Sequence, residues 1–141
     1  FDLATAKLAP ISPEGITAYF CAIASPDGRF AFASSPAGKL TLYPVGEGEP
    51  LVVPGTSSDD VPIRWTEDGK AIFVRSESGV PAKVERVDVT TGERQPWLEL
   101  VPPDPAGVQG IGPIHLSADG RSYVYSYRRK LDQLYVVKGL R

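Results

Sequence analysis

A turn-like motif recurs three times along the chain and constrains its fold more than any other feature. The copies are Ser25–Phe32, Thr66–Phe73 and Ser117–Val124, and each reads as a hydroxyl residue, any residue, Asp, Gly, a basic residue and a short strand-like run. Their Asp-Gly pairs are 41 and then 51 residues apart. Self-similarity at such a period is typical of repeat architectures. Asp-Gly between strand-like runs predicts a tight hairpin, because Gly readily adopts the positive φ of primed turns.

The segments around these turns predict four short strands in each repeat. They are rich in Val, Ile, Phe and Tyr, and no segment of ten or more residues has a clean helical period. We expect first strands at 20–24, 62–65 and 113–116, second strands at 30–34, 71–75 and 122–126, third strands at 39–43, 83–89 and 133–137, and fourth strands at 50–53, 95–98 and 7–9. Four strands in about 40–50 residues are typical of a propeller blade.

The expected fold class is therefore all-β, a β-propeller fragment of about three four-stranded antiparallel blades. Residues 1–141 form this single fragment, with 1–10 as an outer strand of a neighbouring blade, 17–54 as blade 1, 61–99 as blade 2 and 112–141 as blade 3, which lacks its outer strand. Three blades cannot close a ring, because propellers typically need four to eight. We expect either a homodimer, in which exchanged N-terminal strands complete a six-bladed ring, or docking to missing blades of a longer parent chain.

Composition excludes several classes of partner. The net charge of −2 does not favour nucleic acid, and no apolar run approaches the ~18 residues that membrane insertion needs. Cys21 is the only cysteine and is expected to be a small core residue. The chain starts at Phe1 and contains no Met, so we expect a fragment or a processed product.

Three stretches carry a resemblance to known families. Ser25–Ser34 resembles the repeat of TolB-like, WD-like bacterial propellers, and Pro62–Lys70 matches the proline, tryptophan and Asp-Gly pattern of those repeats more fully. Ser117–Arg141 is similar to the C-terminus of bacterial receptor-type serine/threonine kinases that carry such a propeller as a sensor. The resemblance implies a sensor domain in a periplasmic or other extracytoplasmic location. Ala24 and Leu116 stand where the family tends to have Trp. No kinase motif is present, so a kinase domain would lie outside this chain.

His115 is the only histidine and the only candidate for a catalytic base. Ser117 and Asp119 follow it, but they begin a turn, which does not bring the three side chains together as a triad requires. Repeat alignment places His115 where Ile23 and Arg64 stand, on the first strands. We therefore expect no catalytic residue, and Arg64 and His115 as residues that line a central channel.

The acidic residues of the three turns recur at one position. A metal ring is one interpretation, and capping of the turn by the Asp side chain is the other and favoured one. We therefore expect no metal site and no cofactor. The residues with this structural role are Asp27, Gly28, Asp68, Gly69, Asp119 and Gly120.

Irregular segments predict the binding surface, because function concentrates in variable loops on a rigid scaffold. In an up-and-down blade, the loops between second and third strands and the connections between blades share one face, opposite the Asp-Gly turns. The residues expected there are Asp59, Asp60, Asp104, Arg128, Arg129 and Lys130. Trp65 is expected in the core, and Trp97 is expected to pack on an outer strand or to stack on a ligand.

The function that we expect is a non-catalytic recognition or sensor module, which binds a protein partner or a small ligand through its loop face. Two alternatives stay open. One is the substrate-filter propeller of a prolyl-oligopeptidase-like peptidase, and the other is a TolB-like envelope scaffold.

Overall fold

The chain folds into antiparallel β-sheets. The computed structural model describes residues 4–16, 23–34, 38–76, 79–117 and 119–139, and within these ranges it contains ten strands and no helix. Every strand pair is antiparallel, so the predicted all-β class is confirmed. The described residues include no helix long and apolar enough to cross a membrane.

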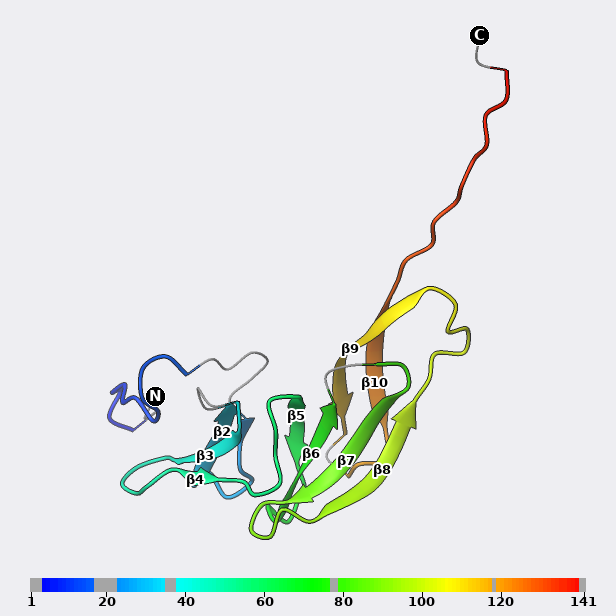
Figure 1. Cartoon of the computed structure of the whole chain (residues 1–141). Helices are drawn as coiled ribbons and strands as arrows, with labels where there is room; N and C mark the ends of the chain where they lie inside the picture. Colours follow the sequence, from blue (N-terminus) through cyan, green and yellow to red (C-terminus); the bar gives the residue numbers. More distant parts are fainter. Residues whose placement is uncertain (1–3, 17–22, 35–37, 77–78, 118, 140–141) are drawn as a thin grey trace.

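The strands form two four-stranded sheets and one two-stranded sheet, which follow one another in chain order (Figure 1). Sheet 1 consists of β1 (Ile23–Ala24), β2 (Phe30–Ser34), β3 (Leu40–Pro44) and β4 (Leu51–Val52). Sheet 2 consists of β5 (Asp60–Trp65), β6 (Ala71–Ser76), β7 (Ala82–Asp88) and β8 (Arg94–Leu100). Sheet 3 consists of β9 (Val108–Leu116) and β10 (Tyr123–Arg129). In sheets 1 and 2 each strand pairs with the next one in the chain, as a meander does.

Sheets 1 and 2 pack against each other through one apolar cluster. Its buried members are Phe32, Leu40, Leu42, Val53, Trp65, Ile72, Val74 and Val87. The Trp65 ring centroid lies 5.7 Å from that of Phe32, and Trp65 Nε1 donates a hydrogen bond of 3.1 Å to the carbonyl of Ile23. Trp65 is only 4% exposed. The prediction that this residue belongs to the core is confirmed, and its side chain joins two sheets.

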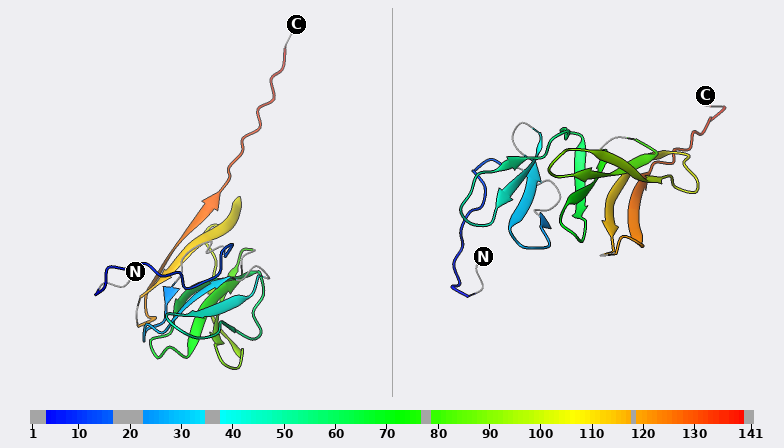
Figure 2. Two further views of the ribbon diagram at one scale, coloured as in Figure 1. Left: turned by 90° about the vertical axis from the view of Figure 1, so that its left-hand side faces the viewer. Right: turned by 90° about the horizontal axis from the view of Figure 1, so that it is seen from below.

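Sheet 3 covers the opposite face of sheet 2, so that the sheets are arranged in a row (Figure 2). The buried members of this second cluster are Phe73, Ala82, Val84, Leu100, Ile111, Ile114 and Leu116. In β6, Ile72 and Val74 belong to the first cluster and Phe73 to the second. A strand with both faces covered reads as a near-continuous apolar run, and this explains why β6 does not alternate with polar residues.

Sheet 3 departs from the predicted four-strand repeat. The predicted third strand, 133–137, is wrong, because residues 130–139 form no strand. The loop position expected for Arg128 and Arg129 is wrong as well, because β10 continues through Arg129 and pairs with the early part of β9, Arg128 with Gly110 and Arg129 with Val108. The physical reason is that β9 begins at Val108, several residues before the predicted start, and offers its backbone to the residues that were expected to turn.

The N-terminal strand predicted at 7–9 is also wrong. Lys7 forms a single bridge, and the residues from 4 to 10 are all exposed. A three-residue run followed by Pro10 offers little backbone to a ladder, since proline has no N–H to donate. Of the first predicted strand, 20–24, residues 20–22 lie outside the described part of the chain, as does Cys21, and β1 covers the rest.

Candidate binding surface

The three Asp-Gly turns have nearly the same geometry. In each, the hydroxyl donates to the Asp Oδ1, at 2.5 Å for Ser25, 2.6 Å for Thr66 and 2.6 Å for Ser117. The amide of the basic residue donates to the same Oδ1 at 3.0 Å in all three turns. The Gly amide donates to the carbonyl of the hydroxyl residue, which closes a β-turn, and Gly takes φ of +71°, +68° and +68°.

The hairpins therefore form, but not through the primed two-residue turn that was predicted. Only the Gly of each turn has a positive φ, whereas a type I′ turn requires it of the Asp as well. The Asp side chain instead accepts hydrogen bonds from the residues around it, which makes the loop longer. In sheet 1 the last backbone hydrogen bond before the loop joins Ser25 to Phe30, and four residues lie between them. This geometry explains why a hydroxyl residue recurs at the start of the turn. In the first turn, Ser25 Oγ donates to Asp27 and also accepts a hydrogen bond of 3.0 Å from the Phe30 amide.

These hydrogen bonds lower the pKa values of the turn carboxylates. The Ser25 hydroxyl, followed by the amide and guanidinium of Arg29, lowers the pKa of Asp27 well below its usual range. The Thr66 hydroxyl and the Lys70 amide lower the pKa of Asp68. For Asp119, the Ser117 hydroxyl and the Arg121 amide lower the pKa in the same way.

The opposite ends of the strands carry the loop residues predicted for binding. Arg129 at the end of β10 binds Asp104 in the segment before β9, with 3.0 Å between Nη1 and Oδ2, and a second Arg129 nitrogen donates to the Asp104 carbonyl. The Arg129 guanidinium also lies over the Tyr127 ring, 5.9 Å from its centroid. Arg128 and Lys130 are exposed on either side of it. The structure thus brings Asp104 and the basic run together.

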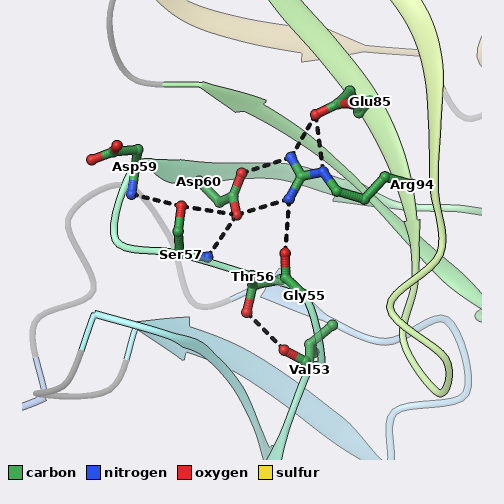
Figure 3. Close-up of polar contacts among 8 residues, drawn as sticks. All are labelled: Val53, Gly55, Thr56, Ser57, Asp59, Asp60, Glu85 and Arg94. Atoms are coloured by element: carbon green, nitrogen blue, oxygen red, sulfur yellow. Dashed lines mark hydrogen bonds and ion pairs between the residues drawn. The ribbon is translucent and has the colours of Figure 1, made fainter.

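Asp60 has a different environment from the other predicted loop residues. It is buried, and Arg94 of β8 holds both of its carboxylate oxygens, at 2.8 Å and 3.0 Å. Arg94 also donates to Glu85 of β7 and to the carbonyl of Gly55 (Figure 3). Burial raises the pKa of Asp60, but hydrogen bonds from Arg94 and from the Ser57 amide outweigh it, so that this pKa lies below its usual value. Hydrogen bonding to Asp60 raises the pKa of Arg94 further.

The Arg94 network therefore joins the first strand of sheet 2 to its last two strands. It also holds the connection from sheet 1, since Arg94 donates to the Gly55 carbonyl at 3.2 Å. Thr56 on the same connection donates to the Val53 carbonyl at 2.7 Å. The neighbouring Asp59 remains exposed and contributes only its amide, to Ser57 Oγ at 3.3 Å. Of the two adjacent carboxylates, Asp59 faces solvent and Asp60 is fully occupied inside the fold.

The two residues expected to line a channel lie in different surroundings. Arg64 of β5 is half-buried and donates to the Leu116 carbonyl of β9 at 2.9 Å, which joins sheets 2 and 3. His115 of β9 is exposed and pairs in register with Val124, which is 64% exposed. Both lie on first strands, but His115 is on the face of sheet 3 that points away from sheet 2.

The prediction that Trp97 packs on an outer strand is confirmed. Its ring centroid lies 4.8 Å from that of Phe73, and it packs against the second cluster.

An open groove of about 520 Å³ runs along the β9–β10 pair, beside Arg128. Its lining residues are Gln109, Gly110, Ile111, Gly112, Pro113, Ser126, Tyr127 and Arg128. The two glycines leave the groove without side chains on this part of β9. A Cβ at Gly110 would meet open space, whereas one at Gly112 would lie 2.4 Å from Ser126 Oγ. The groove is not among the features expected from the sequence, and the Gly-x-Gly spacing of Gly110 and Gly112 is the signal that could have indicated it.

Among the described residues, no group of three or more His, Cys, Asp or Glu side chains is placed to hold a metal ion. Comparison with protein-family models and with curated proteins finds no match to the chain.

Proposed function

We propose that the chain is a β-propeller fragment that works as a non-catalytic recognition module, which binds a protein segment at the loop end of sheet 3. The propeller part of this proposal is supported by the packing. Repeat-equivalent strands stack sheet on sheet, and equivalent first-strand positions carry the contacts between neighbours, Trp65 to Ile23 and Arg64 to Leu116. A module of this kind would act within a larger protein, as the resemblance to bacterial sensor kinases implies.

The β9–β10 groove is the observation that carries the recognition role. It combines the half-buried Gly110, where no side chain covers the strand, with the cation of Arg128 at its edge. The Lys130–Asp132 and Arg129–Asp104 ion pairs lie next to it along the same strand end. The absence of a side chain at Gly110 leaves room for an extended peptide along the strand pair, and the cation of Arg128 favours acidic side chains on that peptide. We therefore propose an extended peptide segment with acidic residues as the ligand.

Selection from a displayed library of random peptides tests the proposal. Peptides that bind the chain are expected to lose about tenfold or more in affinity for Arg128→Glu, because charge reversal replaces attraction with repulsion. Gly110→Leu is expected to have a similar effect, since it fills the groove at a position where a side chain meets no other atom.

Arg121→Glu is the matched control, because Arg121 is also exposed but belongs to the Asp-Gly turn at the opposite end of β10. Selected peptides that bind Gly110→Leu and Arg128→Glu as well as they bind the original chain would contradict the proposed site.

A further inference from the structure

Strand β10 has one paired edge and one open edge. In the complete sheets the second strand is paired on both sides, β2 by β1 and β3, and β6 by β5 and β7. In the described part of the chain, β10 pairs with β9 alone. An open edge presents a row of backbone N–H and C=O groups that can accept another strand.

The segment after β10 has the sequence of a third strand. Leu134-Tyr135-Val136-Val137 matches Leu42-Tyr43-Pro44-Val45, the part of sheet 1 where β3 ends. These four residues are 94%, 78%, 77% and 71% exposed. Exposure of four consecutive large apolar side chains to water is unfavourable. The segment therefore has the composition of a strand that is buried against a partner, but in this chain it has no such partner among the described residues.

The path of the chain prevents this segment from folding back onto β10 as it stands. Five residues separate β2 from β3 in sheet 1, and the equivalent five in sheet 3 are residues 127–131. Tyr127, Arg128 and Arg129 of these are part of β10, and the amide of Lys130 donates to the Gly107 carbonyl at 2.9 Å. The residues that would form the hairpin loop are thus paired with β9, and the chain leaves the body as an extension of β10 (Figure 1).

We propose that Gln133–Val137 of one copy pairs antiparallel with the open edge of β10 in a second copy. The Gln133–Val137 segment of the second copy pairs in the same way with β10 of the first. A straightened hinge that leads to an extended strand is the arrangement expected for exchange of an element between copies. The inference rests on the repeat architecture proposed above and not on the peptide-binding role. It replaces the N-terminal exchange expected from the sequence, because the strand that β10 needs beside it is the third and not the fourth.

Sheet 1 supplies the register of the exchange. Phe32 pairs with Leu42 and Ala31 with Tyr43, so the equivalent pairs are Val124 with Leu134 and Tyr123 with Tyr135. The first pair covers Val124, which is 64% exposed.

The second pair places Tyr135 opposite the end of a tyrosine row on β10. In this row, Tyr123, Tyr125 and Tyr127 have successive ring centroids 6.3 Å apart. Aromatic and apolar pairs that face each other across strands stabilise a sheet, so both pairs favour the proposed register.

Disulfide trapping distinguishes exchange from a hairpin within one chain. In a Cys21→Ala background, Val124→Cys combined with Leu134→Cys places both thiols at one cross-strand pair. In sheet 1 the Val45 amide donates to the Arg29 carbonyl at 2.8 Å, so Arg29 and Val45 form a hydrogen-bonded pair. Hydrogen-bonded and non-hydrogen-bonded pairs alternate along an antiparallel ladder, so Phe32 with Leu42 is a non-hydrogen-bonded pair. The equivalent Val124 and Leu134 therefore have Cβ atoms close enough for a disulfide. The expected product on non-reducing electrophoresis is a covalent dimer.

Val124→Cys with Tyr135→Cys is the matched control, because a slip of one residue places the two thiols on opposite faces. This variant is expected to remain uncrosslinked. A disulfide closed within one chain, or no disulfide at Val124 and Leu134, would overturn the exchange.

Two proline variants give a second readout without cysteines. By the alternation in sheet 1, the Gln133 amide faces β10 and the Val136 amide faces away, and β3 carries Pro44 at the position of Val136. In light scattering at a series of concentrations, Gln133→Pro is expected to weaken the dimer about tenfold or more, because it removes a ladder hydrogen bond. Val136→Pro is expected to leave the dimer intact, as the Pro44 precedent indicates.

A monomeric original chain, or equal effects of the two prolines, would overturn the proposal. Gly110→Leu separates this inference from the recognition role, since it blocks the groove and leaves the β10 edge unchanged.

Discussion

Replacing Trp65 with alanine tests how strongly the first two sheets hold each other. The indole is 4% exposed and contacts Phe32 across the sheet boundary, with 5.7 Å between ring centroids. Truncation of a large buried aromatic side chain costs about 3–5 kcal/mol, the transfer term plus the cavity that remains. Small domains are stable by about 5–15 kcal/mol in total, so we expect Trp65→Ala to remove a large part of the free energy of unfolding.

Urea denaturation at one fixed protein concentration measures this loss, with the free energy of unfolding taken by linear extrapolation. Trp97→Ala is the matched control, because Trp97 is half-buried and its truncation is expected to cost about half as much. Trp65→Phe retains most of the apolar volume and loses the hydrogen bond to Ile23, so we expect a loss of about 1–2 kcal/mol. A loss below about 1 kcal/mol for Trp65→Ala would refute the packing role of this residue.

Three further predictions concern the charges and the fold. Arg94→Met is expected to lower the free energy of unfolding by about 3–5 kcal/mol at pH 7, because it leaves the Asp60 carboxylate buried without its partner. In urea titration, the double variant Arg94→Met with Asp60→Asn is expected to regain part of this stability, and no gain over Arg94→Met alone would argue against this cause. The pKa values of Asp27, Asp60, Asp68 and Asp119 lie below the value of about 3.9 for an unfolded chain, so their stabilisation is present above that pH and is lost as the pH falls through the folded values. Denaturation at a series of pH values is therefore expected to show a plateau above about pH 5 and a fall below about pH 4, and equal stability at pH 2 and pH 7 would be inconsistent with these shifts. Far-ultraviolet circular dichroism is expected to show less than about 10% helix, and a helix-dominated spectrum would contradict the all-β fold.

The sequence predicted the two complete sheets because their information is local. Each Asp-Gly turn fixes a hairpin within six residues, and the apolar runs on either side can only be strands of one meander. The strand boundaries in sheet 2 agree with the predicted ones to within two residues at each end. The turn type was missed because the Asp side chain accepts hydrogen bonds from the turn itself, a competition that the dipeptide alone does not reveal.

The features that the sequence did not predict depend on contacts between distant residues. Tyr127–Arg129 contains no Gly, Pro or Asn, and whether it turns or extends is decided by the backbone of Val108–Gly110 on the neighbouring strand. The Arg94–Asp60 pair joins residues 34 positions apart, and no local pattern distinguishes this arginine from exposed ones. For this reason the sequence predicts Asp60 on the binding surface together with Asp59, whereas the structure buries it.

Nuclear Overhauser contacts between Phe32 and Trp65 test the central claim that successive sheets of the repeat stack on one another. With ring centroids 5.7 Å apart and the Trp65 Nε1 donating to the Ile23 carbonyl, we expect cross-peaks from the Trp65 ring protons to the Phe32 ring and from its Nε1 proton to Ile23. If the hairpins form but these cross-peaks are absent, the sheets do not stack and the propeller account is contradicted.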